Sequence, residues 1–495
     1  MLSSHLPLLQ VVIPLLAAPV CVILHNKTLG WCLATVVSLV SFIIACTLFG
    51  QAASGESVTY AIGGWAAPAG IEYHLDRLTA FLLVIITGLA AFILIGAREN
   101  LENEIAADRL YLFYTAFLLN LTGLLGVIMT GDAFNVFVFI EIASLSSYAM
   151  ISISKDRRSL YAAYKYLILG TIGASFILIS IGLLYGLTGT LNIYDLHDRL
   201  ADLENKRTLA TALVFFTIGI GLKAAIWPLH LWLPDAYTYS PSIVSTFLAG
   251  TSTKVFIYVL VRFIYSLFGI EFSFGVAGLQ YLLMLMAVVG ILYGSIQAIR
   301  QDSIKRLLAF SSIAQIGYMV LGISLATAAG LAAGLIHVFN HAIIKATLFL
   351  CVANIIYYTG TDSLKQLGGI GKKMPFTMGL MVIAGLSIIG VPLTAGFISK
   401  WFLIQSAMAN GYWLLIGLVV FSSILAVVYT WKILETAYFS DAAEAGPVIQ
   451  DKPVPYSMYA TLIIFTGACV YFGLQTDVSV GMATATAESL AGIRP

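Results

Sequence analysis

The sequence predicts an all-α polytopic membrane protein with about 14 transmembrane helices. Of its 495 residues, 60% are hydrophobic and only 10% are charged, and the mean hydropathy is +0.96. A soluble domain has about 25% charged residues, so this chain lacks the polar surface that a water-soluble globule of its size needs. The formal net charge of +1 provides no field that would attract nucleic acid. These values exclude a soluble enzyme, a disordered protein and a nucleic-acid-binding protein.

The individual helices follow from the spacing of apolar runs. A bilayer core of about 30 Å needs roughly 20 apolar residues per helix. Runs of this kind are expected near 8–24, 29–49, 77–97, 110–130, 133–153, 161–186, 209–231, 241–267, 276–298, 304–324, 327–358, 376–406, 412–437 and 455–474. The first run has no basic residue before it, so we interpret it as a retained helix and not as an export signal.

The loops predict the orientation of the chain. Lys and Arg are concentrated in the loops after odd-numbered helices, for example at Arg157, Arg158 and Lys305, and are sparse in the other loops. The positive-inside rule then places these loops in the cytoplasm and both termini outside, in a bacterial cytoplasmic (inner) membrane. The Gly-rich segment Gly50–Asp76 alternates Val, Tyr and Ile, which predicts an external hairpin.

Two spans contain proline at related places. Pro228 lies in the seventh span and Pro392 in the twelfth, and a proline inside a helix removes a hydrogen-bond donor and breaks or kinks the helix. Breaks at corresponding positions of two halves are typical of inverted-repeat transporters. We therefore predict two inverted five-helix repeats with broken helices 7 and 12. The single membrane domain 1–495 divides into helices 1–3 (1–109), repeat one (110–267), repeat two (275–437) and a C-terminal helix (455–474).

Ionisable residues within the predicted spans are the candidate functional residues. Glu141, Lys223, Lys254 and Lys400 lie well inside apolar runs, where an ionisable group costs several kcal/mol and usually marks an ion path. Basic residues outnumber acids at this depth, so not every Lys can have a carboxylate partner. A row of amines around one carboxylate can exchange protons, with the charge on one group affecting the next. This arrangement requires no cofactor and no metal ion.

A second group lies on one helix face. His337, His341 and Lys345 are four residues apart, so they share a face of the eleventh span. The HxxxH spacing also fits a metal pair, but no HExxH motif or extra carboxylate accompanies it. The five scattered cysteines form no CxxC pair and indicate no cluster, zinc or disulfide framework.

Other polar residues have simpler interpretations. Lys165 lies near a helix end and can extend its amine to the membrane surface, and we interpret Arg262 as an interface anchor. Asp132 and Asp235 flank helix starts, where they can cap the helix or interact with its dipole.

The chain resembles the antiporter-like membrane subunits of Mrp-type cation/proton antiporters, respiratory complex I and membrane-bound hydrogenases. The matching stretches are TGDAFNVFVFIEIASLSSYAM, KAAIWPLHLWLPDAY, STKVFIYVLVR, SIKRLLAFSSIAQIGY, HVFNHAIIKATLF and GVPLTAGFISKW. The D-type member of the Mrp antiporters is most similar, although LHLWLPDAY is closer to complex I subunits. The resemblance implies that Glu141 is the fifth-helix acid and that Lys223, Lys254 and Lys400 are the bases of helices 7, 8 and 12. It also implies that His337, His341 and Lys345 link them, and that Lys165 is a partner of the acid.

Three hypotheses follow for function. The first is a proton-translocating subunit of a multi-subunit monovalent cation (Na⁺)/proton antiporter, acting with companion subunits and without enzymatic chemistry of its own. The second is the same pump within a complex I-like NADH:quinone oxidoreductase or an energy-converting hydrogenase, with the redox centres on other chains. The third is a passive scaffold, which would explain neither the depth nor the number of the buried charges.

Overall fold

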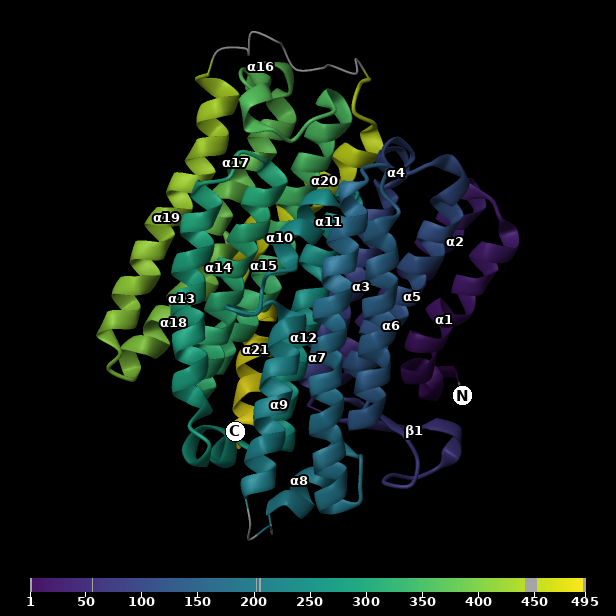
Figure 1. Cartoon of the computed structure of the whole chain (residues 1–495), viewed down its shortest axis with the longest axis vertical. Helices are drawn as coiled ribbons and strands as arrows, with labels where there is room; N and C mark the ends of the chain where they lie inside the picture. Colours follow the sequence, from purple (N-terminus) through teal and green to yellow (C-terminus); the bar gives the residue numbers. More distant parts are fainter. Residues whose placement is uncertain (1, 56, 202, 204–205, 441–451, 493–495) are drawn as a thin grey trace.

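The computed structural model describes residues 2–55, 57–201, 203, 206–440 and 452–492, and confirms a helical membrane protein (Figure 1). In this part of the chain, 13 helices are long and apolar enough to cross a membrane. The predicted twelfth span is instead divided into two helices of 15 residues each, Pro375–Ile389 (α17) and Ala395–Ala409 (α18). Because each half is too short to span a bilayer alone, the pair together makes the remaining crossing.

The long helices run side by side in a bundle (Figure 1). They are α1 (Leu6–Leu24), α2 (Lys27–Ala53), α3 (Arg77–Ile95), α5 (Leu110–Met129), α6 (Ala133–Ser152), α7 (Arg158–Thr188), α9 (Arg207–Ala224), α13 (Leu279–Ile299), α14 (Ile304–Ser324), α15 (Ala328–Thr359), α19 (Trp413–Tyr438) and α20 (Tyr456–Leu474). Shorter helices are α4 (Arg98–Glu104), α8 (Ile193–Ala201), α10 (Leu233–Tyr239), α11 (Ser242–Gly250), α12 (Ser252–Arg262), α16 (Ile370–Lys373) and α21 (Asp477–Leu490).

Side-chain caps fix where several helices begin. The side chains of Asn26, Asp76, Asp132, Ser303 and Thr327 each accept a hydrogen bond from a backbone N–H in the first turn of the following helix. These groups satisfy donors that have no partner inside the helix, which matters most next to a membrane. The cap predicted at Asp132 is confirmed by its 2.7 Å bond from the N–H of Asn135.

The predicted hairpin is confirmed. Strands β1 (Val58–Ala61) and β2 (Glu72–Leu75) pair antiparallel, with Val58 opposite Leu75. Figure 1 shows β1 and α8 at one end of the bundle and α4 and α16 at the other. We call the first end the hairpin face and the second the lysine-rich face, because α16 contributes Lys372 and Lys373.

Both predicted breaks lie between helices. Helix α9 ends at Ala224, the next residue Ala225 has a left-handed backbone (φ 56°), and Pro228 follows before α10 begins. Helix α17 is followed by Gly390 (φ 91°), and Pro392 lies before α18. A left-handed residue ends a helix because the next N–H groups no longer point along its axis. The division into repeats at 110–267 and 275–437 stays a prediction.

A third helix interruption is not predicted by the sequence. The eighth span is one apolar run in sequence, yet α11 and α12 are separated at Thr251, whose φ and ψ are −117° and −67°. No proline or left-handed glycine marks the position, and its only local signal is the low helix propensity of Gly250 and the Thr and Ser residues after it. The interruption leaves the carbonyl of Ala249 available to a side chain, as described below.

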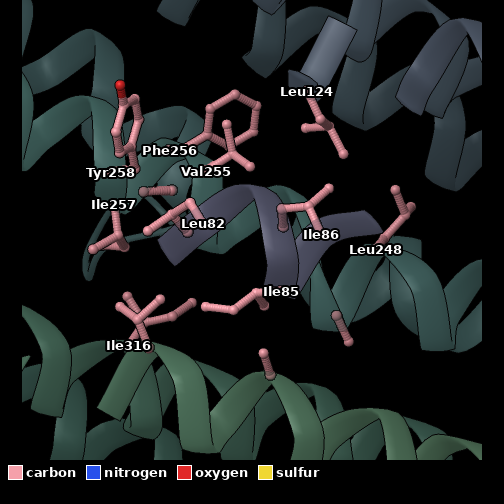
Figure 2. Close-up of a cluster of buried hydrophobic side chains, with 14 of the residues drawn as sticks. Leu82, Ile85, Ile86, Leu124, Leu248, Val255, Phe256, Ile257, Tyr258 and Ile316 are labelled. Carbon is pink, nitrogen blue, oxygen red and sulfur yellow. The ribbon is translucent and has the colours of Figure 1, made fainter. Parts of the chain in front are cut away.

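Helix α3 forms part of the apolar core. Figure 2 shows Leu82, Ile85 and Ile86 of this helix among side chains of α5, α11, α12 and α14. The packing places α12 deep inside the bundle, where all of its residues are buried. The amine of Lys254 is therefore surrounded by protein and not by lipid.

Candidate functional site

Glu141 and Lys223 form an ion pair between α6 and α9. The Lys223 Nζ lies 2.8 Å from Glu141 Oε1 and 2.8 Å from the Ser144 hydroxyl. Lys223 is fully buried, while the Glu141 side chain is 26% exposed on the outer side of α6. Since Lys223 is the penultimate residue of α9, its position depends on where that helix ends.

Lys165 does not contact Glu141. It lies 2.7 Å from Asp235 Oδ2, and the other carboxylate oxygen of Asp235 accepts from Arg306 at 2.9 Å. The partnership with the acid of helix 5 that the resemblance implies for Lys165 is therefore absent from this structure. Asp235 does lie in the first turn of α10, as predicted, but it also joins α7 to α14.

Lys254 is held by the interruption of the eighth span. Its Nζ donates to the carbonyl oxygen of Ala249 and lies 3.3 Å from the Thr253 hydroxyl. In an uninterrupted helix the N–H of residue 253 would take that carbonyl. The amine replaces a backbone donor, so the hydrogen bond satisfies both the carbonyl that the break frees and the buried amine.

Lys400 is held in the same way by the break in the twelfth span. Its Nζ donates to the carbonyls of Ile388 (3.1 Å) and Ile389 (2.8 Å) and to Ser423 (3.1 Å). The two carbonyls belong to the last turn of α17, which carries the negative end of the helix dipole. The amine also lies 5.1 Å from the centre of the Tyr318 ring.

The face of His337, His341 and Lys345 connects α15 to its neighbours. His337 Nδ1 lies 2.8 Å from the Ser399 hydroxyl of α18, and the rings of His337 and His341 are 5.9 Å apart and nearly parallel. Lys345 points to α14, where its Nζ donates to the Leu308 carbonyl at 2.7 Å. All three side chains are buried.

The site residues form clusters and not one unbroken chain of direct contacts. Among the described residues, Lys223 and Lys254 share no hydrogen bond, and neither ring nitrogen of His341 has a protein partner. Buried nitrogens of this kind are normally satisfied by water. Proton movement between the clusters therefore requires water or side-chain motion.

The buried lysines differ in whether a carboxylate balances their charge. Within the described part of the chain, Lys254, Lys345 and Lys400 have only hydroxyl and carbonyl partners and no carboxylate. No opposite charge fixes an amine of this kind, so its protonation responds to the charges around it. Such groups can take up and release protons.

The interpretation of Arg262 as an interface anchor is wrong. Its guanidinium is buried and forms a bidentate pair with Asp76 at 2.6 and 2.8 Å. No sequence pattern points to this partner, because 186 residues separate the two. Sequence reasoning also misses the serines that contact the lysines, since serine is common throughout the helices of this chain.

Comparison with known proteins gives a consistent result. The family model described as NADH:quinone oxidoreductase/Mrp antiporter, TM, matches residues 130–426. The chain is 41% identical over 460 residues to NADH-quinone oxidoreductase subunit N of Desulforudis audaxviator (strain MP104C), covering 92% of this chain and 90% of that protein. It is 31% identical over 477 residues to the antiporter subunit mnhD2 of Staphylococcus aureus (strain MRSA252), covering 96% and 94%.

Solved structures share the fold. A chain of the membrane-bound sulfane sulfur reductase, an archaeal respiratory membrane complex, matches with a TM-score of 0.89 and 29% identity over 98% of both chains. A chain of the Mrp complex from Dietzia sp. DQ12-45-1b also matches with a TM-score of 0.89, at 24% identity over 99% of this chain and 98% of that chain.

Proposed function

Because the chain belongs to the NADH:quinone oxidoreductase/Mrp antiporter membrane family, we propose that it is the proton-translocating subunit of a multi-subunit monovalent cation (Na⁺)/proton antiporter. The observation that carries the proposal is the 2.8 Å contact between the fully buried amine of Lys223 and Glu141, next to the break that ends α9. A proton that reaches either group changes the charge of the pair, and that change affects the neighbouring amines.

In this proposal the proton passes through both halves of the chain. It reaches Glu141 or Lys223, continues by Lys254 and the face of His337, His341 and Lys345, and leaves near Lys400. The breaks at Pro228 and Pro392 control hydration, because carbonyls freed there attract water. The lysine-rich face lies in the cytoplasm of a bacterium, and both termini lie outside.

The partial exposure of Glu141 supports companion subunits. Phe134, Val138, Glu141 and Leu145 share the outer side of α6, and an ionised carboxylate does not face lipid without cost. A neighbouring subunit that covers this side would bring Glu141 into contact with its own polar groups. We call these four residues the α6 face.

The test uses the intact complex. Glu141→Gln and Lys223→Ala should each lower cation-dependent proton transport in everted vesicles to about a hundredth or less, as expected when a proton-transfer group is lost. Lys365→Ala is the matched control, because Lys365 forms an exposed pair with Asp302 and should leave transport unchanged. Wild-type transport in both assembled variants would refute the proposal.

A second candidate is the proton-pumping subunit of a complex I-like NADH:quinone oxidoreductase or related respiratory complex. The observation that favours it is the 41% identity to a quinone oxidoreductase subunit, which exceeds the 31% identity to the antiporter subunit. Mass spectrometry of the purified complex distinguishes the two. Iron–sulfur or flavin subunits would establish the oxidoreductase, whereas only small hydrophobic subunits would establish the antiporter.

A further inference from the structure

A polar stripe runs along α12 from its first turn to its end at the hairpin face. Lys254, Tyr258 and Arg262 are spaced by four residues, so all three lie on one side of the helix. At about 1.5 Å per residue, the stripe covers about 12 Å along the helix axis. All three side chains are buried, and Figure 2 labels Tyr258 beside Phe256 and Ile257.

Tyr258 and Arg262, the two residues of the stripe nearest the hairpin face, join three helices. Arg262 pairs with Asp76 and donates to the Thr79 hydroxyl of α3 at 3.1 Å. The Tyr258 hydroxyl donates to the carbonyl of Ile128 in α5 at 2.7 Å, and the guanidinium lies 5.3 Å from its ring. The guanidinium and the phenol therefore close the space between α3, α5 and α12 at this level.

The far side of the ion pair opens to a polar pocket. A pocket of about 190 Å³ lies between the start of α3 and the end of α21, and its lining is mostly polar: Gly55, Ser57, Asp76, Arg77, Thr486 and Ser489, with Leu78 and Leu490. The Asp76 side chain is 23% exposed there, whereas Arg262 is only 6% exposed. The ion pair thus lies between a pocket that water can enter and the buried stripe that leads to Lys254.

The opposite charges of Asp76 and Arg262 hold the pair closed. Burial by itself would raise the pKa of Asp76, but the guanidinium of Arg262 holds it well below its usual range. The carboxylate is therefore ionised at physiological pH, and its charge attracts the guanidinium into the bidentate contact. This contact keeps the guanidinium between the pocket and the stripe, where it fills the space that water would need.

We propose that Asp76, Arg262 and Tyr258 form a gate that controls proton exchange between Lys254 and the hairpin face. When the ion pair is closed, the Tyr258 hydroxyl is directed to the Ile128 carbonyl and Arg262 blocks the route. When Arg262 moves away from Asp76, water from the pocket can reach the stripe, and the phenol can relay a proton to or from Lys254. The inference rests on the proposed function, because it requires that Lys254 carries protons.

The alternative is that the pair only fastens α12 to α3. The two roles differ in one measurement, the passive proton conductance of the assembled complex without a cation gradient. A fastening pair affects assembly and thermal stability alone, whereas a gate that is weakened lets protons through.

The experiment uses the intact complex in proteoliposomes and follows internal pH after an external pH jump without Na⁺. Asp76→Asn should increase proton influx by about tenfold, because removing about 1.4 kcal/mol of barrier changes a rate by that factor. Combining it with Lys254→Ala should return influx to the wild-type level. Asp195→Asn is the control, since Asp195 pairs with Arg199 in α8 at the same face and should not change influx.

Two outcomes would overturn the gate: wild-type influx in assembled Asp76→Asn, or a leak that persists when Lys254 is removed. If Asp76→Asn does not assemble, proton influx is measured in Arg262→Lys instead. Lysine keeps the positive charge but cannot form the bidentate contact with Asp76. Wild-type influx in that variant overturns the inference, and increased influx supports it. Failure of the proposed function would be seen separately, as normal transport in the Glu141 and Lys223 variants.

Discussion

Each buried lysine of this chain is held by a different set of oxygen atoms, and these sets determine what its charge can do. Lys223 has the carboxylate of Glu141, whereas Lys254 and Lys400 have backbone carbonyls that helix breaks release. The depth of these residues in the membrane could be predicted from the apolar runs around them, because depth follows from the position of a residue within its own span. Their partners could not, since a partner is fixed by the packing of helices that are far apart in the chain.

Asp235 shows most clearly that the partners of a charged residue could not be predicted from the sequence. A carboxylate near a helix start predicts a cap, but the structure gives it two cationic partners, Lys165 and Arg306. Asp235→Asn should leave both cations without an opposite charge and lower the stability of the complex by about 1–2 kcal/mol, because both cations are partly exposed.

The measurement is the midpoint of thermal unfolding of the purified complex, which should fall by several degrees. Asp302→Asn is a suitable control, because Asp302 is more than half exposed and forms only surface pairs. An unchanged midpoint in Asp235→Asn would mean that the cluster does not hold α7, α10 and α14 together.

At the scale of the element, the interrupted helices position the buried amines of Lys254 and Lys400. The breaks at Pro228 and Pro392 could be predicted because proline and glycine alter the backbone locally. The interruption at Thr251 could not, because Gly250 and the Ser and Thr residues after it weaken a helix without fixing a break. Packing against other helices, and the amine of Lys254 on the Ala249 carbonyl, compensate for the lost backbone bond.

Gly390 offers a direct test of this positioning. It caps the end of α17 with φ of 91°, and a Cβ at this residue would lie 2.9 Å from the Cδ of Lys400. Gly390→Ala should therefore displace the Lys400 side chain and lower proton transport about as strongly as Lys400→Ala does. The transport assay in everted vesicles measures both variants.

Gly379→Ala is the matched control within α17, because a Cβ there meets no atom within 4 Å and the residue is helical. Alanine at that residue should leave transport unchanged. Normal transport in Gly390→Ala would show that the end of α17 does not determine where the Lys400 amine lies.

At the scale of the whole molecule, the class, the approximate number of spans and the hairpin could all be predicted from the sequence. Composition and apolar runs are sufficient for the class and the spans because a bilayer imposes both on a chain. The hairpin follows from the Gly-rich segment with alternating Val, Tyr and Ile. The apolar surface of the bundle does not show which side meets lipid and which meets protein, because both environments favour the same residues. Glu141, an ionisable group on that surface, distinguishes one side from the others.

The α6 face should therefore be covered by a companion subunit. Leu145 is 56% exposed on this face, and Leu145→Lys would force a charge into the contact, which should lower the yield of companion subunits that co-purify with the chain. The measurement is the subunit ratio in the purified complex. Leu414→Lys is the control, because Leu414 is 88% exposed at the start of α19, where a lysine can reach water.

Full recovery of companion subunits with Leu145→Lys would place the subunit contact elsewhere on the bundle. Loss of companions in both variants would indicate a general effect of added charge and not a specific contact at α6.

The carbonyl partners of Lys254 and Lys400 have one more consequence. A neutral amine keeps two N–H groups, so it can still donate to a carbonyl after its proton has left. A carboxylate partner would lose most of its attraction at that moment, and the helices it joined would tend to separate. At these two lysines the charge can come and go while the hydrogen bonds that shape the bundle persist, so each transfer requires little rearrangement of the surrounding protein.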